Sequence, residues 1–248
     1  MNARYLTSAV AVVLAGCAGM PPQTWEVTPE IRAVVASPDR SAADRKTDER
    51  RKPELLLAFA GVRPGMHVLE VGAGAGYSAE LLARSVGPQG VVYALNSPEA
   101  IARFIKTRFD ERAAKPAMRN VVKLVREFDD PVPADVRNLD LATMLFEYHD
   151  TPAAGVDRAK MNRAIFAALK SGGHFVVADH AAKAGSGLSA CMTLHRIDEA
   201  ALRQEVEAAG FKFVASADFL RNPDDPRDTS SLRATIPVDA FVLKFVKP

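Results

Sequence analysis

The stretch His67-Val-Leu-Glu-Val-Gly-Ala-Gly-Ala-Gly-Tyr77 decides how this chain is expected to fold. A short apolar strand leads into an acidic residue, Glu70, and a helical segment, residues 78–86, follows. Between them, glycine occupies three alternate positions, Gly72, Gly74 and Gly76. Glycine accepts φ > 0 and lets the backbone approach a ligand closely, while the start of the next helix presents free N–H groups. We interpret the stretch as a loop that seats a nucleotide-like cofactor, in preference to a plain tight turn.

Segments of strand length alternate with helical segments along the rest of the chain. The expected strands are residues 66–71, 91–95, 121–125, 139–146, 174–178, 211–216 and 239–246. Strands that alternate with helices form a parallel sheet with helices on both faces. The last two strands have no helical segment between them, which predicts an antiparallel hairpin at the end of the sheet. The expected fold class is therefore α/β, with seven strands.

The composition is that of an ordinary globular protein. The 248 residues are 48% apolar and 25% charged, and 32 basic against 30 acidic residues give a net charge of +2. This balance lacks the basic excess of a nucleic-acid-binding protein, so we expect no nucleic-acid partner. No apolar run approaches the roughly 20 residues of a spanning helix. Two cysteines, Cys17 and Cys191, are too few for a disulfide framework or a cysteine-based zinc site.

The first residues have the layout of a secretory signal peptide. One positive charge, Arg4, precedes a short apolar segment, residues 6–15, which runs into Leu14-Ala15-Gly16-Cys17. These four residues resemble the lipobox of bacterial lipoproteins. The resemblance implies cleavage before Cys17 and a lipid on its sulfur, so that the protein is anchored to a membrane rather than spanning it.

This interpretation divides the chain into a signal peptide, residues 1–16, a proline-containing linker, residues 17–29, and a domain, residues 30–248. It places the protein in the bacterial cell envelope, facing the periplasm, with the lipid anchor as its only contact with the membrane. The alternative is that translation starts at Met20 and gives a cytoplasmic protein.

The domain begins with a charged region, about residues 30–60, that we interpret as a helical lid. Its densest part, residues 37–53, mixes acidic and basic side chains. One alternative is a solvated helix with pairs of charges four residues apart, and the other is a lid over the cofactor cleft. Composition does not choose between the two.

The run Glu70-Val-Gly-Ala-Gly-Ala-Gly76 resembles motif I of class I S-adenosylmethionine-dependent methyltransferases. Leu169-Lys-Ser-Gly-Gly-His174 is similar to the turn before the fifth strand of that family, and the expected strand order with its terminal hairpin agrees. Parts of residues 37–53 resemble a group of exported, predicted methyltransferases. The resemblance covers about residues 50–248 and implies a seven-stranded, Rossmann-like methyltransferase sheet that binds S-adenosyl-L-methionine.

The resemblance also implies roles for individual residues. The glycine loop would approach the methionine and ribose parts of the cofactor, Glu70 would orient its amino group, and Tyr77 would flank the pocket. The family usually has Asp or Glu at the end of the second strand, where this chain has Asn96, so we expect weaker or altered ribose recognition. The region of Glu127 and Asp129 matches the one that meets the adenine.

A second cofactor fits part of the same loop. Gly74-Ala-Gly-Tyr-Ser-Ala79 matches the dinucleotide fingerprint Gly-x-Gly-x-x-Ala. That fingerprint requires an acidic residue about 20 positions further on, and only Asn96 is near. The terminal hairpin favours the methyltransferase layout, and NAD binding stays a minor alternative.

Histidines and carboxylates gather where the expected fourth and fifth strands end. The two strand ends read Phe146-Glu-Tyr-His-Asp150 and Val177-Ala-Asp-His180, and His195 follows in the next loop. Ligands of parallel α/β sheets bind outside the carboxyl ends of the strands. A histidine here can act as a general base, and two or three with a carboxylate can bind a divalent metal. Ordinary hydrogen bonding is the third alternative, and the absence of a recognised ligand spacing favours the base over the metal.

We therefore predict a methyltransferase that acts on an unknown small molecule, with His149, His180 and His195 as candidate catalytic residues. Two alternatives stay open. One is a non-catalytic binding protein on the same fold, because fold alone does not determine function. The other is a metal-dependent or NAD-dependent envelope enzyme. The sequence leaves the methyl acceptor and the oligomeric state open.

Overall fold

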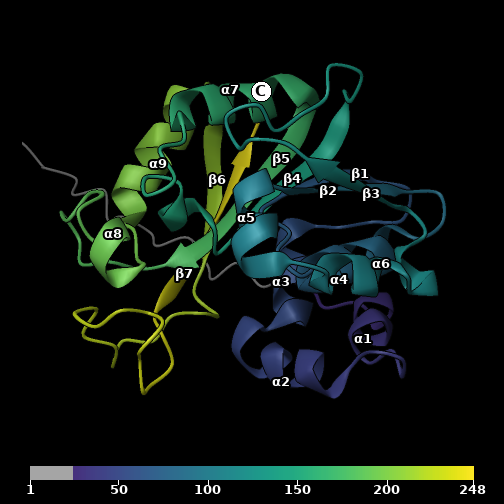
Figure 1. The fold of residues 1–248 in the computed structure, drawn as a ribbon, viewed down its shortest axis with the longest axis horizontal. Coiled ribbons are helices and arrows are strands. Elements are labelled where there is room, and N and C mark those ends of the chain that lie inside the picture. Colours follow the sequence, from purple (N-terminus) through teal and green to yellow (C-terminus); the bar gives the residue numbers. More distant parts are fainter. Residues whose placement is uncertain (1–24) are drawn as a thin grey trace, which may run out of the picture.

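The computed structural model describes residues 25–248 (Figure 1). The predicted signal peptide, the lipid site at Cys17 and the alternative start at Met20 lie outside the described residues. Within the described part of the chain, no helix is both long enough and apolar enough to cross a membrane.

A single seven-stranded sheet forms the centre of the molecule, in the order β3-β2-β1-β4-β5-β7-β6. Its strands are β1 His67–Val71, β2 Val91–Asn96, β3 Val121–Val125, β4 Leu139–Leu145, β5 Leu169–His180, β6 Lys212–Ala217 and β7 Ala240–Val246. The first five strands pair in parallel, whereas β7 lies between β5 and β6 and is antiparallel to both. The predicted fold class, with its terminal antiparallel pair, is confirmed.

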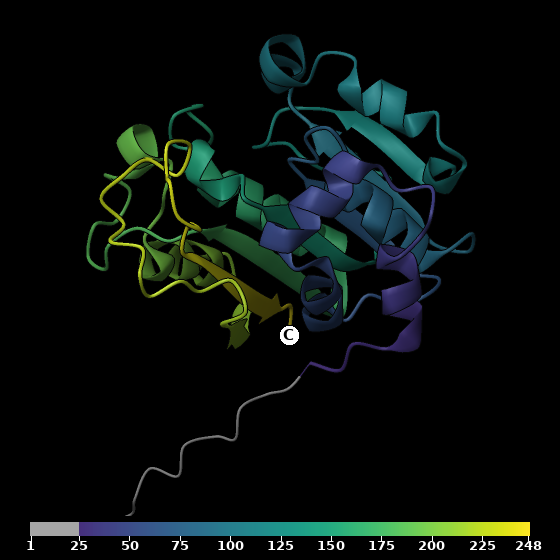
Figure 2. The ribbon, with the colours of Figure 1, turned by 90° about the horizontal axis from the view of Figure 1, so that it is seen from below.

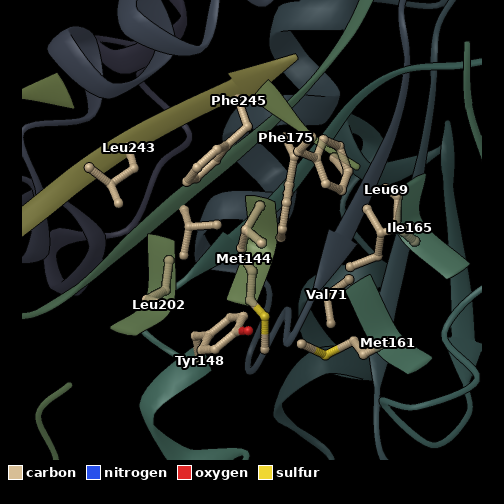
Figure 3. Packing of buried hydrophobic residues seen from close by; sticks show 14 of the residues in the cluster. Leu69, Val71, Met144, Tyr148, Met161, Ile165, Phe175, Leu202, Leu243 and Phe245 are labelled. Atoms are coloured by element: carbon tan, nitrogen blue, oxygen red, sulfur yellow. The ribbon is translucent and has the colours of Figure 1, made fainter. Parts of the chain in front are cut away.

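Helices cover both faces of this sheet (Figures 1 and 2). The longer ones are α1 Pro29–Val35, α2 Ala42–Arg51, α3 Pro53–Ala60, α4 Tyr77–Val86, α6 Arg108–Ala113, α7 Arg158–Ala168 and α9 Glu199–Ala208. Short helical turns are α5 Pro98–Ala100 and α8 Cys191–Leu194. Successive strand residues point to opposite faces, so Val68 packs with α1, α3 and α4, while Leu69 packs with α7 and α9. Figure 3 shows the second of these two cores.

One helical region is interrupted, and one strand differs from the sequence prediction. Lys106, with φ of 52°, separates a π-helical turn, Ile101–Ile105, from α6. Strand β5 starts five residues earlier than expected, at Leu169, because this residue still pairs with Leu139 across an irregularity in the β4–β5 register.

Two loop regions, the loop after β5 and residues 218–239, gather with α2 at the carboxyl ends of the parallel strands. This is the edge of the sheet at which the sequence predicts a ligand. Residues 218–239, drawn in yellow, lie against the loop after β5 (Figure 2). Among the contacts that hold them, the Nη1 of Arg196 donates to Oδ2 of Asp225 over 2.7 Å, and the Ser231 N–H donates to the Leu194 carbonyl over 2.9 Å.

Candidate active site

The glycine loop has the left-handed geometry expected of it. The φ angles of Gly72, Gly74 and Gly76 are 76°, 56° and 84°. A side chain at Gly72 would also collide with Glu147, because an added Cβ would lie 2.4 Å from its Cγ. At Gly76 the added Cβ would lie 2.9 Å from Cδ of Arg112. Gly72 and Gly76 therefore require glycine both for backbone conformation and for space, whereas Gly74 requires it for conformation alone.

Asn96, at the end of β2, forms hydrogen bonds with the backbone of the glycine loop. Its side chain is buried, its Oδ1 accepts the Gly74 N–H over 2.8 Å, and its Nδ2 donates to the Gly74 carbonyl over 3.0 Å. Both ends of the amide are thus committed to one residue of the loop. An aspartate could accept from the Gly74 N–H but could not donate to its carbonyl.

Glu70, at the end of β1, is a buried carboxylate. Only 1% of the residue is exposed, and among residues 25–248 neither carboxylate oxygen has a hydrogen-bond partner. Burial raises the pKa of Glu70 to about 7, against the opposing effects of the nearby Ser78 hydroxyl and of the Arg51 charge. A buried, unpartnered acceptor at the start of a glycine loop suits a ligand that brings its own donor, such as an ammonium group.

Arg51, at the end of α2, has a charge that acts on Glu70 and is a residue that the sequence interpretation missed. Its Cζ lies 3.5 Å from the centroid of the Phe146 ring, and its buried Nε has no hydrogen-bond partner among the described residues. Burial lowers the pKa of Arg51 to about 9, which leaves the guanidinium charged at neutral pH. A cation over an aromatic face is favourable. The sequence signal was one charge among many in residues 37–53, which is too little to single it out.

Ion pairs and hydrogen bonds attach the rest of α2 to the segments around the glycine loop. Arg40 makes a bidentate pair with Asp48, with both N–O distances 2.7 Å, and the Tyr77 hydroxyl donates to the same carboxylate over 2.6 Å. A second link runs from Arg112 to Asp44, with two bonds of 2.8 Å. The α2 helix therefore lies against the start of α4 rather than standing free in solvent.

Arg112 connects this link to the glycine loop. It donates to the Ala75 carbonyl over 2.8 Å and to Glu80 over 2.6 Å, and Glu80 is itself only 1% exposed. Burial acts to raise the pKa of Glu80, but its three cationic partners, Lys115, Arg84 and Arg112, keep it below the usual range.

The predicted histidines come together at the ends of β4 and β5. His149 Nδ1 lies 2.6 Å from Oδ1 of Asp179, and the His149 N–H donates to the other oxygen over 2.9 Å. The His180 N–H also donates to Asp179, over 2.7 Å. The carboxylate is fully buried and is held by all three contacts. Phe146 turns the chain into this cluster with φ of 62°, an unusual conformation for a bulky residue.

His195 reaches the same place from the loop after β5. Its Nδ1 lies 2.9 Å from Oδ1 of Asp150, and the same oxygen lies 3.3 Å from His149 Nε2. One ligand atom from each of the three residues falls within 4.8 Å of the others. The centroid of the His149 ring lies 5.6 Å from that of His180 and 5.7 Å from that of His195.

Electrostatics distinguish the members of the cluster. Burial lowers the pKa of His149, but the Asp179 carboxylate outweighs this effect and raises it to about 9. Burial lowers the pKa of His180 to about 3, so its ring is neutral at physiological pH. Burial and the Asp150 charge raise the pKa of Glu147 to about 7. His149 is therefore the basic centre of the cluster, with its Nε2 facing Asp150.

A cavity of about 620 Å³ opens beside these groups. Polar residues on its wall include His149, Asp150, His180 and His195. Apolar residues complete it, together with Arg50 and Arg51: Phe104, Phe146, Leu232, Ala234, Ile236, Pro237 and Val238. Arg51 thus lines this cavity and also acts on Glu70.

Glu127 and Asp129 follow β3 and do not join either group. Glu127 is exposed, and Asp129 lies 3.4 Å from the Nζ of Lys160 on α7. Phe128, between them, is buried in the core. Their contact with an adenine ring stays a prediction.

The chain matches the family model described as "Methyltransferase domain" over residues 63–212. A curated relative is the Arabidopsis thaliana protein named "Putative rRNA 2'-O-methyltransferase fibrillarin 3", 26% identical over 183 residues. The match covers 71% of this chain but only 59% of that protein, so the chain spans less than two thirds of its relative.

Solved structures share the fold. An S-adenosylmethionine-dependent methyltransferase from Aquifex aeolicus gives a TM-score of 0.59 at 20% identity, covering 84% of this chain and 98% of that one. Aeropyrum pernix fibrillarin, solved with natively bound S-adenosyl-L-methionine, gives 0.50 at 16% identity, covering 75% and 68%. The family match includes the glycine loop and the ends of β4 and β5, and it favours methyl transfer over the NAD-dependent alternative. The chain belongs to the methyltransferase domain family.

Proposed function

We propose that this protein transfers a methyl group from S-adenosyl-L-methionine to a small molecule held in the cavity beside the histidine cluster. The observation that carries the proposal is the shared wall of the two sites. Arg51 and Phe146 line the cavity, and Arg51 also acts on the buried Glu70 carboxylate at the start of the glycine loop. A ligand on the loop and a ligand in the cavity would therefore meet at this wall.

The cofactor's binding residues follow from the loop. Gly72, Gly74 and Gly76 leave its backbone open to close approach, and Glu70 supplies an acceptor for the ammonium group. Asn96 acts here by holding the loop in shape, since its amide is already bonded to Gly74. Tyr77 acts similarly on α2 through Asp48. Following the family resemblance, Glu127 and Asp129 lie on the adenine side.

When bound, S-adenosyl-L-methionine supplies an electrophilic methyl group on a sulfonium. The chain's own task is to orient the acceptor and to take away its proton. His149 is the histidine best arranged for this task, because Asp179 orients its ring and raises its pKa to about 9. Its Nε2 takes the proton of the acceptor in the neutral form of the ring, after the imidazolium has released its own proton. The pKa of His180 is too low for this task. Its ring packs against Phe146 and beside the ring of His149.

A small acceptor fits this site better than RNA. The cavity is of the size that small-molecule sites have, it is mostly apolar, and its polar groups converge on one side. The net charge of +2 is without the overall basic excess that is typical of proteins that bind a phosphate backbone. The Arabidopsis relative is named as an rRNA methyltransferase, so RNA is the natural negative control for acceptor tests.

We further propose that the protein is anchored in the bacterial cell envelope by a lipid on Cys17. Mass measurement of the N-terminal peptide from a membrane fraction tests this. A lipidated peptide beginning at Cys17 supports it, and its absence together with a free N-terminus at Met20 contradicts it.

Calorimetry on the full chain tests the function. The titrants are S-adenosyl-L-methionine, S-adenosylhomocysteine and NAD, and Glu70→Ala is the matched variant. We expect both S-adenosyl compounds to bind at one site, NAD not to bind, and Glu70→Ala to weaken binding at least tenfold. Failure of both S-adenosyl compounds to bind would overturn the proposal and leave the non-catalytic alternative.

A further inference from the structure

We propose that His149, Asp150 and His195 together bind one divalent transition-metal ion at the wall of the acceptor cavity. The donors are the Nε2 of His149, a carboxylate oxygen of Asp150 and the Nδ1 of His195. The inference rests on the proposed function for the role of the ion, while binding of the ion can be tested alone.

The spacing of the three donors suits a metal ion. Ligands about 2.1 Å from a common ion lie about 3.0–3.4 Å apart when they occupy adjacent positions. The Asp150 oxygen lies 2.9 Å from His195 Nδ1 and 3.3 Å from His149 Nε2. The remaining separation, between His149 and His195, has to close to the same range, and one ligand atom from each of the three residues already lies within 4.8 Å of the others.

Asp179 gives the site its outer shell. Metal-binding histidines usually donate their second ring N–H to a carboxylate, which fixes the tautomer and makes the ring a stronger ligand. The Nδ1 of His149 is 2.6 Å from Asp179, and that carboxylate is fully buried and held by two backbone N–H groups. Hydrogen bonding to Asp179 alone would account for the orientation of His149. Here a second histidine, His195, also contacts the Asp150 oxygen that lies beside the Nε2 of His149.

Two residues in left-handed conformations bring these donors together. Phe146 has φ of 62° just before the turn that carries His149 and Asp150, and His195 itself has φ of 48°. Such conformations are strained for residues other than glycine and persist where the surrounding structure demands them. Here both lie on the segments that converge on Asp150.

The chemistry of the donors selects the ion. Two imidazoles and one carboxylate suit zinc, iron, manganese or cobalt, whereas magnesium and calcium prefer sites made of oxygen. The side chains of Asp150 and His195 are 43% and 36% exposed, so three protein donors leave positions open toward the cavity. An open position beside a substrate cavity is typical of catalytic rather than structural metal sites.

The ion would change how the acceptor loses its proton. An acceptor hydroxyl bound to the ion becomes more acidic, and its O–H bond breaks with the proton passing to water in the cavity. The oxygen lone pair forms the new bond to the methyl carbon, and the electrons of the broken carbon–sulfur bond stay on sulfur. His149 then serves as a ligand, and coordination replaces its role as a general base.

Cobalt binding tests the site without any methyl transfer. The full chain, produced without a histidine tag and stripped with a chelator, is titrated with Co²⁺ while its visible absorption is followed. We expect one equivalent to produce a d–d band, which Zn²⁺ abolishes and Mg²⁺ leaves unchanged. His195→Ala, at a partly exposed position, should weaken Co²⁺ binding at least tenfold. Asp150→Asn, also partly exposed, should do the same.

His67→Ala is the matched control, because His67 starts β1 at the opposite end of the sheet. It should leave the band and the affinity unchanged. Absence of a band from the folded chain overturns the inference. An equal loss of affinity in His67→Ala and His195→Ala, or no loss in the latter, also overturns it.

Calorimetry with the metal-free chain separates the two proposals. Binding of S-adenosyl-L-methionine without Co²⁺ binding would reject the metal site and leave His149 as a general base. Binding of Co²⁺ without either S-adenosyl compound would support the metal site and reject the methyltransferase mechanism. Binding of both, with transfer lost on chelation and restored by the ion, is the expected result.

Discussion

The side-chain amide of Asn96 makes both of its hydrogen bonds to the backbone of Gly74, 22 residues earlier in the chain. A residue at the position where the family resemblance implies a ribose contact therefore also holds the glycine loop. The family resemblance alone would predict that an aspartate at position 96 improves cofactor binding. The two hydrogen bonds to Gly74 predict the opposite.

Asn96→Asp should destabilise the chain and weaken cofactor binding. The aspartate loses the donor to the Gly74 carbonyl and brings a carboxylate oxygen within about 3 Å of it, which costs about 1–3 kcal/mol. Urea denaturation measures the first effect, and calorimetry with S-adenosyl-L-methionine measures the second.

The matched control is Asn120→Asp, because the Asn120 amide also donates to backbone carbonyls, those of Ala83 and Gly87. It should lower stability by a similar amount and leave the cofactor affinity unchanged. Tighter cofactor binding by Asn96→Asp would contradict the loop-holding role and support direct ribose recognition.

Arg51→Met should favour the sulfonium form of the cofactor over its product. The Arg51 guanidinium lies near Glu70, where a positively charged sulfonium would be repelled by it. Repulsion between two partly screened cations several ångströms apart is on the order of 1–2 kcal/mol, or about tenfold in affinity. S-adenosylhomocysteine has no charge on its sulfur, so the ratio of the two dissociation constants reports the effect.

Arg51→Lys keeps the charge and serves as the control for lost packing on Phe146. It should leave the ratio of the two constants close to that of the parent. If Arg51→Met changes both affinities by the same factor, the charge has no selective effect on the sulfonium.

Glu70→Gln should stabilise the free protein at high pH. The folded-state pKa of Glu70, about 7, lies above its unfolded value of 4.5, so the folded chain binds the extra proton between these values. Stability therefore falls as pH rises from about 4.5 to 7 and stays low above that. The glutamine variant lacks this penalty and should gain about 1–3 kcal/mol above pH 7.

Denaturant melts at pH 5 and pH 8 measure this difference. The two proteins should be nearly equal at the lower pH and differ at the higher one. A constant difference at both values would show that Glu70 does not titrate in this window. The same variant should bind S-adenosyl-L-methionine more weakly, since it lacks the carboxylate that we assign to the ammonium group.

Arg112→Gln should loosen α2 without unfolding the sheet. Arg112 joins Asp44 on α2 to Glu80 on α4, and its loss leaves Asp44 without its bidentate partner. We expect faster amide hydrogen exchange in residues 42–51 and unchanged exchange in β4 and β5. Arg103→Gln, which breaks an exposed pair with Glu99, is the control and should change neither region.

The sheet was predictable from the sequence because its signals are local. Short apolar runs, glycine turns and the missing helix before the last strand define seven strands and their direction. The same reasoning placed His149 and His180 at one edge, because the carboxyl ends of adjacent parallel strands meet there. Which atoms bond to Asp179 depends on the turns that follow the strands, and no local signal encodes those.

The contacts of α2 could not be predicted because the helix buries charges rather than an apolar stripe. Arg40 and Asp44 are each less than 6% exposed, yet in the sequence they belong to an evenly charged run. Their partners, Asp48 and Arg112, include one residue 68 positions away. The bonds of Asn96 have the same origin, since they depend on how the end of β2 meets the loop after β1.

The close approach of Gly72 to Glu147 has a consequence for the order of events in the site. No methyl group fits between the loop that we assign to the cofactor and the turn that carries His149. A ligand that shifts the glycine loop toward this turn would therefore press on the side chain of Glu147. Cofactor and acceptor would sense each other's arrival through the contact between the Gly72 backbone and the Glu147 side chain, before they touch.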